Sequence, residues 1–284
     1  MIKSPQISIL IANYNNGHFF KDAFESLRLQ TFENWEAIII DDASTDCSVE
    51  IIQNLIEGDS RCHFYQNSEN IGYQRTIVRA ISISRTEIFG RLDPDDALHS
   101  EAIELSLKAH RENPEVGLAY SNIIFCDSKL VPTHINKGRQ IETLDESSYN
   151  FDGAIWHFVT FKRKIYNRTS GIDPFNRRAE DQDIYLKMGE AAPVKYVDNN
   201  MYFYRVHDKG ASTGKQNDKA FFWQWIALVK MAERRDHNLE DLFSEHFVNA
   251  QLVVPYKRRW LYLMDKVKKS SILSVLFRLI GKKF

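Results

Sequence analysis

Three carboxylates fall within four positions in the segment Arg91-Leu92-Asp93-Pro94-Asp95-Asp96, directly after the apolar, strand-like residues 87–90. Packing alone gives no reason to place three mutually repelling carboxylates at the mouth of a strand. Carboxylate oxygens are the ligands that hard divalent cations prefer. The segment therefore indicates a cation-binding site, with a divalent metal as the leading candidate. A solvated acidic turn that caps the following helix would use the same residues.

Short apolar runs alternate with helical patterns through the first half of the chain. Strands are expected at 7–12, 37–40, 63–66 and 88–92, and helices at 18–29, 48–56, 74–84 and 100–111. This alternation is typical of a parallel sheet wrapped by helices, in which ligands bind beyond the carboxyl ends of the strands. Polar clusters follow three of the strands, at 13–16, 41–46 and 93–96. We expect these three strand ends to converge on one crevice.

The second half of the chain has longer strand-like segments and then helices. Strands are expected at 118–125, 156–161, 194–197 and 201–205, a loop-rich interval at 132–149, and helices at 221–232, 239–248 and from Tyr256 onward. This pattern predicts a catalytic domain at residues 1–214 and a helical C-terminal region at 215–284.

Composition is that of an ordinary globular protein, since 284 residues with 43% hydrophobic content can bury one large core. The cysteines Cys47, Cys62 and Cys126 are odd in number and widely spaced. They fit neither a disulfide framework nor a zinc site, so a reducing cytoplasm is the expected compartment. No apolar run approaches the roughly 20 residues of a membrane span, and no secretory signal is evident.

The last 29 residues differ in charge from the rest of the chain. Nine Lys or Arg and the single Asp265 lie from Tyr256 onward, whereas 28 basic and 37 acidic residues precede Tyr256. Apolar residues at 260–264 and 272–280 interleave with these basic residues, as in an interfacial helix on an anionic membrane. A helix that packs on protein, with a solvated basic face, would show the same pattern, so both interpretations stay open.

Six sequence blocks, taken together and in order, resemble the family 2 glycosyltransferases of the GT-A fold. They are SILIANYN at 8–15, QTFENWE at 30–36, IDDASTD at 40–46, NIG at 70–72, RLDPDD at 91–96 and AEDQD at 179–183. The resemblance covers about residues 5–212. It implies an α/β, GT-A (Rossmann-like) fold with a mixed, mostly parallel sheet flanked by helices, here followed by a helical C-terminal extension.

The resemblance also implies a nucleotide-diphosphate sugar donor and a Mn²⁺ or Mg²⁺ cofactor. In the family the divalent cation bridges the diphosphate and an Asp-X-Asp element, which Asp93-Pro94-Asp95 matches. Asp95 would then be the direct metal ligand, and Asp93 would lie nearer the ribose or the water shell of the metal. Asp96 would support the loop or face the transferred sugar. His207 corresponds to a late family histidine that reaches back to the metal or diphosphate, although lone histidines are more often structural.

By the same resemblance, the residues after the first two strands surround the nucleotide. Ala12 and Tyr14 follow the first strand, and the Tyr14 ring can stack on the base. Asp42 can accept a hydrogen bond from a base N–H, which favours uracil or a similar imide. Alternatively, residues 41–46 could simply form a turn that caps the next helix. Arg75 lies where the family often has a basic residue facing the diphosphate, although the local spacing departs from the commoner pattern.

Asp181 corresponds to the general base of the family. The Glu180-Asp181 pair opens a helical segment, where the helix dipole favours an ionised carboxylate that can accept a proton. Helix capping is the alternative, but it would account for only one of the acidic residues Glu180, Asp181 and Asp183. Trp156 and His157 are candidates for the acceptor pocket because aromatic faces suit sugar rings. Glu180 is a further candidate for the same pocket. Core packing is the alternative for Trp156.

The predicted function is inverting, metal-dependent transfer of a sugar from a nucleotide-diphosphate sugar, expected to be UDP-linked, to a hydroxyl of a glycan or lipid-linked saccharide. A cytoplasmic location is expected, with peripheral contact at the inner face of the membrane if the tail binds lipid. No nucleic-acid partner is expected. A sugar-1-phosphate nucleotidyltransferase should carry a Gly-rich, Arg-containing loop at residues 13–18, which this chain lacks. A non-catalytic sugar-nucleotide binding protein could lack the Glu180-Asp181 pair.

Overall fold

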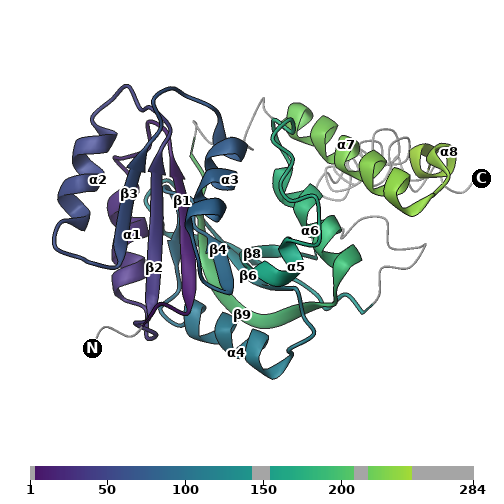
Figure 1. The fold of residues 1–284 in the computed structure, drawn as a ribbon, viewed down its shortest axis with the longest axis horizontal. Helices are drawn as coiled ribbons and strands as arrows, with labels where there is room; N and C mark the ends of the chain where they lie inside the picture. Colours follow the sequence, from purple (N-terminus) through teal and green to yellow (C-terminus); the bar gives the residue numbers. More distant parts are fainter. Residues whose placement is uncertain (1–3, 143–153, 208–216, 245–284) are drawn as a thin grey trace, which may run out of the picture. The chain divides into compact units, whose positions relative to one another are not determined.

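The computed structural model describes residues 4–142, 154–207 and 217–244 of the chain (Figure 1). Two compact units make up the chain, Met1–Met231 and Ala232–Phe284, and the site described below lies within the first. The predicted division into residues 1–214 and 215–284 stays a prediction. The basic tail at 256–284 lies outside the described residues, so its membrane role also stays a prediction.

A nine-stranded sheet forms the centre of the first unit, with the strand order β3-β2-β1-β4-β8-β6-β9-β5 and with β7 paired to β6. The strands are β1 (Ile7–Asn13), β2 (Trp35–Asp41), β3 (Cys62–Gln66), β4 (Ile88–Arg91), β5 (Ala97–Leu98), β6 (Leu118–Cys126), β7 (Pro132–Asn136), β8 (Trp156–Lys162) and β9 (Val194–Arg205). The helices are α1 (Phe20–Arg28), α2 (Ser48–Ile56), α3 (Tyr73–Ile83), α4 (Ala102–Glu112), α5 (Arg163–Tyr166), α6 (Glu180–Ala191), α7 (Asn217–Arg235) and α8 (Leu239–Leu242).

The first half of the sheet is parallel, and its strands β1, β2 and β4 are almost entirely buried. Strands β3, β2, β1 and β4 run in the same direction, and all seven residues of β1 are buried. Alternate residues of a strand point to opposite faces, so Ile7, Ile9 and Ile11 join the core formed with α1, α2 and α4. Helix α3 packs against β1 and β2 (Figure 1). Continuous apolar runs are what a doubly covered parallel sheet requires.

The second half of the sheet reverses direction but delivers its ends to the same edge. Strand β8 is antiparallel to β4, β6 is antiparallel to β8, and β9 is parallel to β6. The carboxyl ends of β1, β2, β4, β6 and β9 therefore share one edge with the first residue of β8. This edge, called the carboxyl edge below, contains the polar clusters noted in the sequence.

Two local expectations were wrong. The interval 132–149 was expected to be loop-rich and no strand was expected in it, but residues 132–136 form β7, whose residues are mostly exposed. The two strands expected at 194–197 and 201–205 are one strand, β9, which follows β6 through two register shifts. The predicted GT-A architecture, a mixed and mostly parallel sheet flanked by helices, is confirmed by the structural comparisons below.

None of the helices in the described ranges is both long enough and apolar enough to cross a membrane.

Acid pH should weaken the fold through His110, which is 5% exposed and whose Nε2 lies 3.0 Å from Thr160 Oγ1. Burial, and then the charge of Lys162, lower the pKa of His110 to about 4. The unfolded chain binds this proton near pH 6.5, so the stabilisation is complete above that pH and is lost as the pH falls towards 4. The loss amounts to about 3 kcal/mol.

Urea unfolding between pH 7 and pH 4 measures this effect. His110→Asn should flatten the pH dependence, because asparagine does not titrate in this range. The matched control is the exposed histidine His63, and His63→Asn should leave the profile unchanged. An equally steep profile in both variants would contradict the assignment.

Candidate active site

The turn after β2 is fixed by the buried carboxylate of Asp41. Its Oδ2 accepts hydrogen bonds from Asn13 Nδ2 at 2.8 Å and Ser44 Oγ at 2.5 Å, and its Oδ1 accepts from the Ser44 amide at 2.8 Å. Ser44 Oγ in turn accepts from the Asn15 amide at 2.9 Å. Asp41 therefore joins the ends of β1 and β2 and has a structural role in this turn.

Asp42 fixes the loop that leads into α3. Its carboxylate is 3% exposed and accepts from Asn67 Nδ2 at 2.6 Å, from the Ile71 amide at 3.0 Å and from the Gly72 amide at 2.9 Å. Gly72 has a φ of +90°, a conformation that favours glycine. Three of the roughly four acceptor positions of the carboxylate are in use, which leaves room for one further donor such as a base N–H.

The other predicted nucleotide residues lie in or directly after β1 and in the first turn of α3. Ala12 is buried in β1, whereas Tyr14 directly after β1 is 46% exposed. The loop that carries Tyr14 packs closely on α2, because the Gly17 amide donates to Ser48 Oγ at 2.8 Å and a Cβ at Gly17 would lie 2.5 Å from the Ser48 backbone. Arg75 is exposed in the first turn of α3, with its guanidinium 6.0 Å from the centre of the Phe175 ring.

The three carboxylates after β4 make three different contacts. Asp93 Oδ1 accepts from the Tyr73 hydroxyl at 2.8 Å, and Asp95 Oδ2 lies 2.9 Å from His207 Nε2. Asp96 is 2% exposed, and its Oδ1 accepts from the Arg205 amide at 2.8 Å. Of the two roles predicted for Asp96, this contact favours support of the loop.

Crowding of these carboxylates changes their protonation. Burial and the charge of Asp93 raise the pKa of Asp95, although His207 acts in the opposite direction. Burial and the charge of Asp95 raise the pKa of Asp96 well above its usual value. The edge thus has an excess of negative charge, which a bound cation would relieve.

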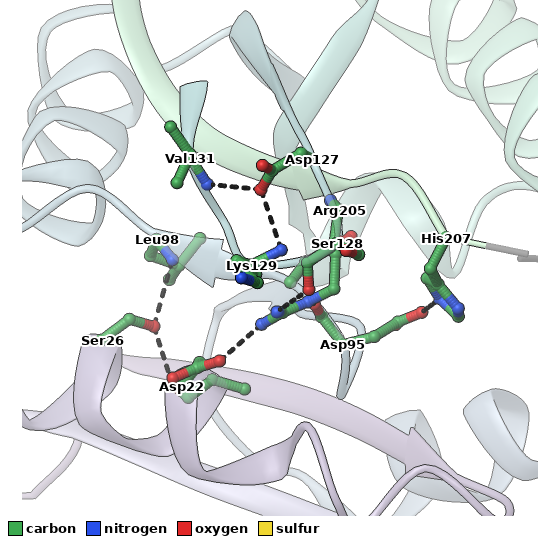
Figure 2. A network of polar contacts seen from close by, with 12 residues as sticks. Asp22, Ser26, Asp95, Leu98, Asp127, Ser128, Lys129, Val131, Arg205 and His207 are labelled. Atoms are coloured by element: carbon green, nitrogen blue, oxygen red, sulfur yellow. Dashed lines mark hydrogen bonds and ion pairs between the residues drawn. The ribbon is translucent and has the colours of Figure 1, made fainter. Parts of the chain in front are cut away.

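Arg205 holds the acidic segment in place from β9 (Figure 2). The guanidinium is 3% exposed and donates to the Asp95 carbonyl at 2.6 Å, to the Ser128 carbonyl at 2.9 Å and to Asp22 Oδ2 at 2.6 Å. It also lies over the Phe19 ring at 4.6 Å, and the Phe19 ring lies 4.9 Å from that of His207. One side chain therefore contacts α1, the turn after β6 and the backbone of Asp95.

Replacement of Arg205 tests this arrangement. Arg205→Met should lower the free energy of unfolding by about 3 kcal/mol, because two carbonyl oxygens and one carboxylate lose the donor that a nearly buried guanidinium supplies. Arg205→Lys should recover only part of the loss, since an ammonium cannot reproduce the planar fork. Urea denaturation measures both.

Asp22→Asn is the matched control, because it alters only the partner whose side chain is 47% exposed. It should cost less than about 1 kcal/mol. Equal losses in Arg205→Met and Asp22→Asn would show that the two carbonyl contacts contribute little.

Arg91 connects the acidic segment to the start of α6. Its guanidinium is 7% exposed, donates to Glu180 Oε1 at 3.1 Å and lies 3.4 Å from His157 Nε2. It also lies 5.5 Å from the centre of the Tyr73 ring. The last residue of β4 thus fixes side chains from α6, β8 and α3 at the carboxyl edge.

This buried cluster keeps opposite charges close together. Burial, and then the charge of Asp181, raise the pKa of Glu180, while Arg91 acts to lower it. Burial and the charge of Arg91 lower the pKa of His157 to about 4, so its ring is neutral near pH 7. Of the predicted acceptor residues, Glu180 and His157 therefore both contact Arg91. Trp156 precedes them at the start of β8, partly buried and edge-on to Phe125.

Asp181 lies in the first turn of α6, where the positive end of the helix dipole favours a negative side chain. Its Oδ1 accepts from the Gln182 amide at 2.8 Å. The residue before the helix, Ala179, has a φ of +52°, which is costly for a residue other than glycine. The preceding loop must therefore be held firmly by its surroundings.

Two lysines hold that loop. Lys187 Nζ in α6 donates to the Gly171 carbonyl at 2.9 Å. Lys230 Nζ in α7 donates to Asp173 Oδ2 and to Asn176 Oδ1, both at 2.7 Å. Helix α7 therefore contributes a contact to the loop that leads to Asp181, although it follows the part of the chain in which the sequence blocks occur.

Loss of Lys230 should loosen this loop. Lys230→Met is expected to lower the free energy of unfolding at pH 7 by about 1–2 kcal/mol, because a carboxylate and an amide oxygen lose their donor. Burial acts to raise the pKa of Asp173, but the hydrogen bonds from Lys230 and from the Phe175 amide, together with the charges of Lys230 and Lys187, leave the pKa lowered. Such a carboxylate stabilises the fold above its unfolded pKa of about 3.9. The difference between variant and parent should therefore shrink below about pH 4.

Urea unfolding at pH 7 and pH 3.5 measures both effects. Lys219→Met, an exposed lysine on the same helix, is the matched control and should change neither value. A Lys230→Met effect that does not depend on pH would contradict the contact with Asp173.

The structure brings most of the predicted residues to one edge, and it adds others. Arg91 lies within the RLDPDD block, Tyr73 follows the NIG block and Arg205 lies two residues before His207. None of the three had a predicted role, since nothing in their spacing names their partners. Lys230 had no signal in the sequence. Helical spacing would have found only the contact of Lys187 with Asp183, at 2.6 Å.

A divalent metal has only a partial preformed site. Among the residues described, no group of three His, Cys, Asp or Glu side chains is arranged to hold a metal. The pair of Asp95 and His207 nevertheless offers an oxygen and a nitrogen ligand at one point. Mn²⁺ and Mg²⁺ commonly take few protein ligands and complete their shell with phosphate oxygens and waters. The residues present therefore fit such an ion.

The fold is that of an α/β protein, and its candidate ligand site lies at the carboxyl edge of the sheet. The model for the family "Glycosyl transferase family 2" matches residues 8–170, and the chain belongs to this family.

Curated relatives agree with this assignment. The chain is 28% identical over 211 residues to the chondroitin synthase of Escherichia coli, a match that covers 74% of this chain and 30% of that protein. It is 25% identical over 213 residues to the hyaluronan synthase of Pasteurella multocida, covering 74% and 21%. The putative glycosyltransferase EpsH of Bacillus subtilis is 26% identical over 242 residues, covering 81% and 68%. The chain thus spans less than a third of the two synthases.

Solved structures show the same fold at low sequence identity. S. aureus TarS 1–349 in complex with UDP-GlcNAc matches with a TM-score of 0.64 and 16% identity, over 80% of this chain and 66% of that one. The mannosyltransferase PcManGT from Pyrobaculum calidifontis, in complex with GDP-Man and Mn²⁺, matches with a TM-score of 0.57 and 14% identity, over 99% and 89%. The resemblance implied by the sequence blocks is confirmed.

Proposed function

We propose that this protein transfers a sugar, with inversion, from a nucleotide-diphosphate sugar to a hydroxyl of a glycan or lipid-linked saccharide. Family membership supports transfer, and the relatives named as chondroitin and hyaluronan synthases support a polysaccharide acceptor. The observation that carries the proposal is the 3.1 Å contact between Arg91 and Glu180. It joins the end of β4, directly before the acidic segment, to α6, which has the candidate base Asp181 in its first turn.

UDP is the proposed nucleotide. The exposed Tyr14 ring provides a stacking surface, and the remaining acceptor position of Asp42 suits the N–H of a uracil. The relative with a similar fold that is bound to UDP-GlcNAc supports the same choice. Arg75 is proposed to face the diphosphate, and Asp93 to lie near the ribose or the water shell of the metal.

Asp95 and His207 are proposed to hold Mn²⁺ or Mg²⁺. When bound, such an ion supplies positive charge that stabilises the departing diphosphate. Arg205 fixes the backbone of Asp95 and packs against Phe19 beside His207, so it positions both ligands.

Asp181 is proposed to act as the general base. It takes the proton of the acceptor hydroxyl while the hydroxyl oxygen forms a bond to the anomeric carbon. The bond from that carbon to the diphosphate oxygen breaks on the opposite side, and the nucleotide diphosphate leaves with the electron pair. A single displacement of this kind inverts the anomeric configuration. Glu180, which is bound to Arg91, keeps the start of α6 beside the acidic segment.

A thermal-shift screen tests the donor class. UDP, GDP and their sugars, with and without Mn²⁺, should include at least one compound that raises the melting temperature, because a ligand that binds only the folded state stabilises it. No shift with any nucleotide diphosphate would count against the whole proposal.

Asp181→Asn tests the base. The rate of sugar transfer should fall at least about a thousandfold, because an asparagine cannot take the proton of the acceptor hydroxyl. UDP affinity should change by less than about twofold. Sugar transfer and isothermal titration with UDP and Mn²⁺ measure the two quantities. The control is Glu190→Gln, an exposed carboxylate at the other end of α6, which should keep full activity. Retained turnover in Asp181→Asn would exclude this residue as the base.

A further inference from the structure

Four aromatic side chains gather at the carboxyl edge, beyond the acidic segment. Phe125 of β6 is at their centre. Its ring is stacked on His134 of β7 at 4.7 Å and is edge-on to Tyr204 of β9 at 5.2 Å and to Trp156 of β8 at 6.1 Å. We call these four residues the aromatic platform.

The platform packs against the core and is only partly buried. Phe125, Trp156 and Tyr204 are only partly buried and pack against the main core, while His134 is exposed. All four come from the half of the sheet that the nucleotide residues do not use. Strand β7, which carries His134, pairs with β6. Partly open aromatic rings beside polar groups are typical of sites that bind small organic ligands.

Tyr204 places the platform beside the acidic segment. Alternate residues of β9 share a face, so Tyr204 follows Tyr202 towards the edge. The Tyr202 hydroxyl accepts from the Asp93 amide at 3.2 Å. Burial, and then the charges of Asp96, Asp93 and Asp95, raise the pKa of Tyr204, and Asp181 contributes in the same direction. Its hydroxyl is therefore protonated. The amide of the next residue, Arg205, donates to Asp96 Oδ1 at 2.8 Å, so this part of β9 lies beside the acidic segment.

The Tyr204 hydroxyl is also available to a ligand. Within residues 4–142, 154–207 and 217–244, no hydrogen bond to this hydroxyl is formed, and it is not among the buried polar atoms that lack a partner. A tyrosine hydroxyl that is not fully buried can donate to, or accept from, a bound sugar. The ring beneath it is held by its contact with Phe125.

We propose that the aromatic platform is the acceptor subsite and that it binds a neutral pyranose. The C–H face of the sugar would lie against Trp156 and Tyr204, and the Tyr204 hydroxyl would hydrogen-bond a sugar oxygen. A neutral ring is favoured because the platform has no fixed positive charge and the nearby carboxylates would repel an acidic sugar. The proposal rests on the proposed function, since only a transferase needs an acceptor beside Asp181.

The rings could instead serve packing alone, and Tyr204→Phe separates the two roles because it removes the hydroxyl and keeps the ring. Phe203→Leu is the matched control, an adjacent aromatic residue on the opposite face of β9 that stacks on His99 at 6.5 Å.

The assay follows UDP release from UDP-GlcNAc and from other UDP-sugars, with water alone and with added acceptors. The acceptors are methyl glycosides of hexoses, N-acetylhexosamines and hexuronic acids. In the parent protein, a neutral glycoside should accelerate UDP release and a hexuronide should not. Tyr204→Phe should raise the KM for the neutral glycoside about tenfold, the effect of one lost hydrogen bond, and Trp156→Ala should raise it at least as much.

UDP affinity should change by less than about twofold in all variants, and Phe203→Leu should behave as the parent. An unchanged acceptor KM in Tyr204→Phe and Trp156→Ala would overturn the proposal, as would preference for the hexuronide or UDP release that no glycoside accelerates. Absence of both UDP binding and UDP release in the parent would instead contradict the proposed function.

Discussion

Negative charge at the carboxyl edge is the constraint on which the rest of this site depends. Asp93, Asp95, Asp96 and Glu180 lie within one region, and mutual repulsion and burial both oppose their ionisation. Within the described part of the chain, two nearly buried guanidinium groups contact this region. Arg91 pairs with Glu180, and Arg205 holds the backbone of Asp95. Because an arginine keeps its charge when buried and offers several fixed donors, it can join elements that would otherwise separate.

The acidic residues of the edge divide into two groups by what they contact. Asp41, Asp42 and Asp96 are almost fully buried, and their carboxylates accept hydrogen bonds from backbone amides or neighbouring side chains. Asp95 and Asp181 remain partly exposed. The first group holds the loops of the edge in place, with one acceptor position of Asp42 left over, and the second group consists of residues proposed to act on the metal and the acceptor. Sequence similarity marks both groups alike, so only contacts can separate them.

The two halves of the sheet suit the two substrates of a transferase. The parallel half ends in Tyr14, Asp42 and the loop of Gly72, which suit a nucleotide. The other half ends in the aromatic platform, which suits a sugar ring. The acidic segment after β4 lies where the two halves meet, because β4 pairs with β1 on one side and with β8 on the other.

Some elements could be predicted and others could not, for physical reasons. Strands β1, β2 and β4 are continuous apolar runs, which a sheet covered on both faces requires. Strand β7 begins with Pro132 and exposes nearly all its residues, so its sequence is that of a loop. The break expected within β9 corresponds to register shifts against β6, and the pairing keeps the strand intact. Its polar residues 198–200 contain no signal for such pairing.

By itself, the sequence determined the alternation of elements, the family and the residue types at the strand ends, because apolar periodicity and ordered motifs are local properties of the chain. Only the tertiary structure decided which charges pair. Arg91 meets Glu180 across 89 residues, and Arg205 meets Asp22 across 183. Strand order and helix packing set those distances, and no spacing in the sequence encodes them. The roles of Arg205, Lys230 and Tyr204 therefore depend on the folded arrangement of β9 and α7.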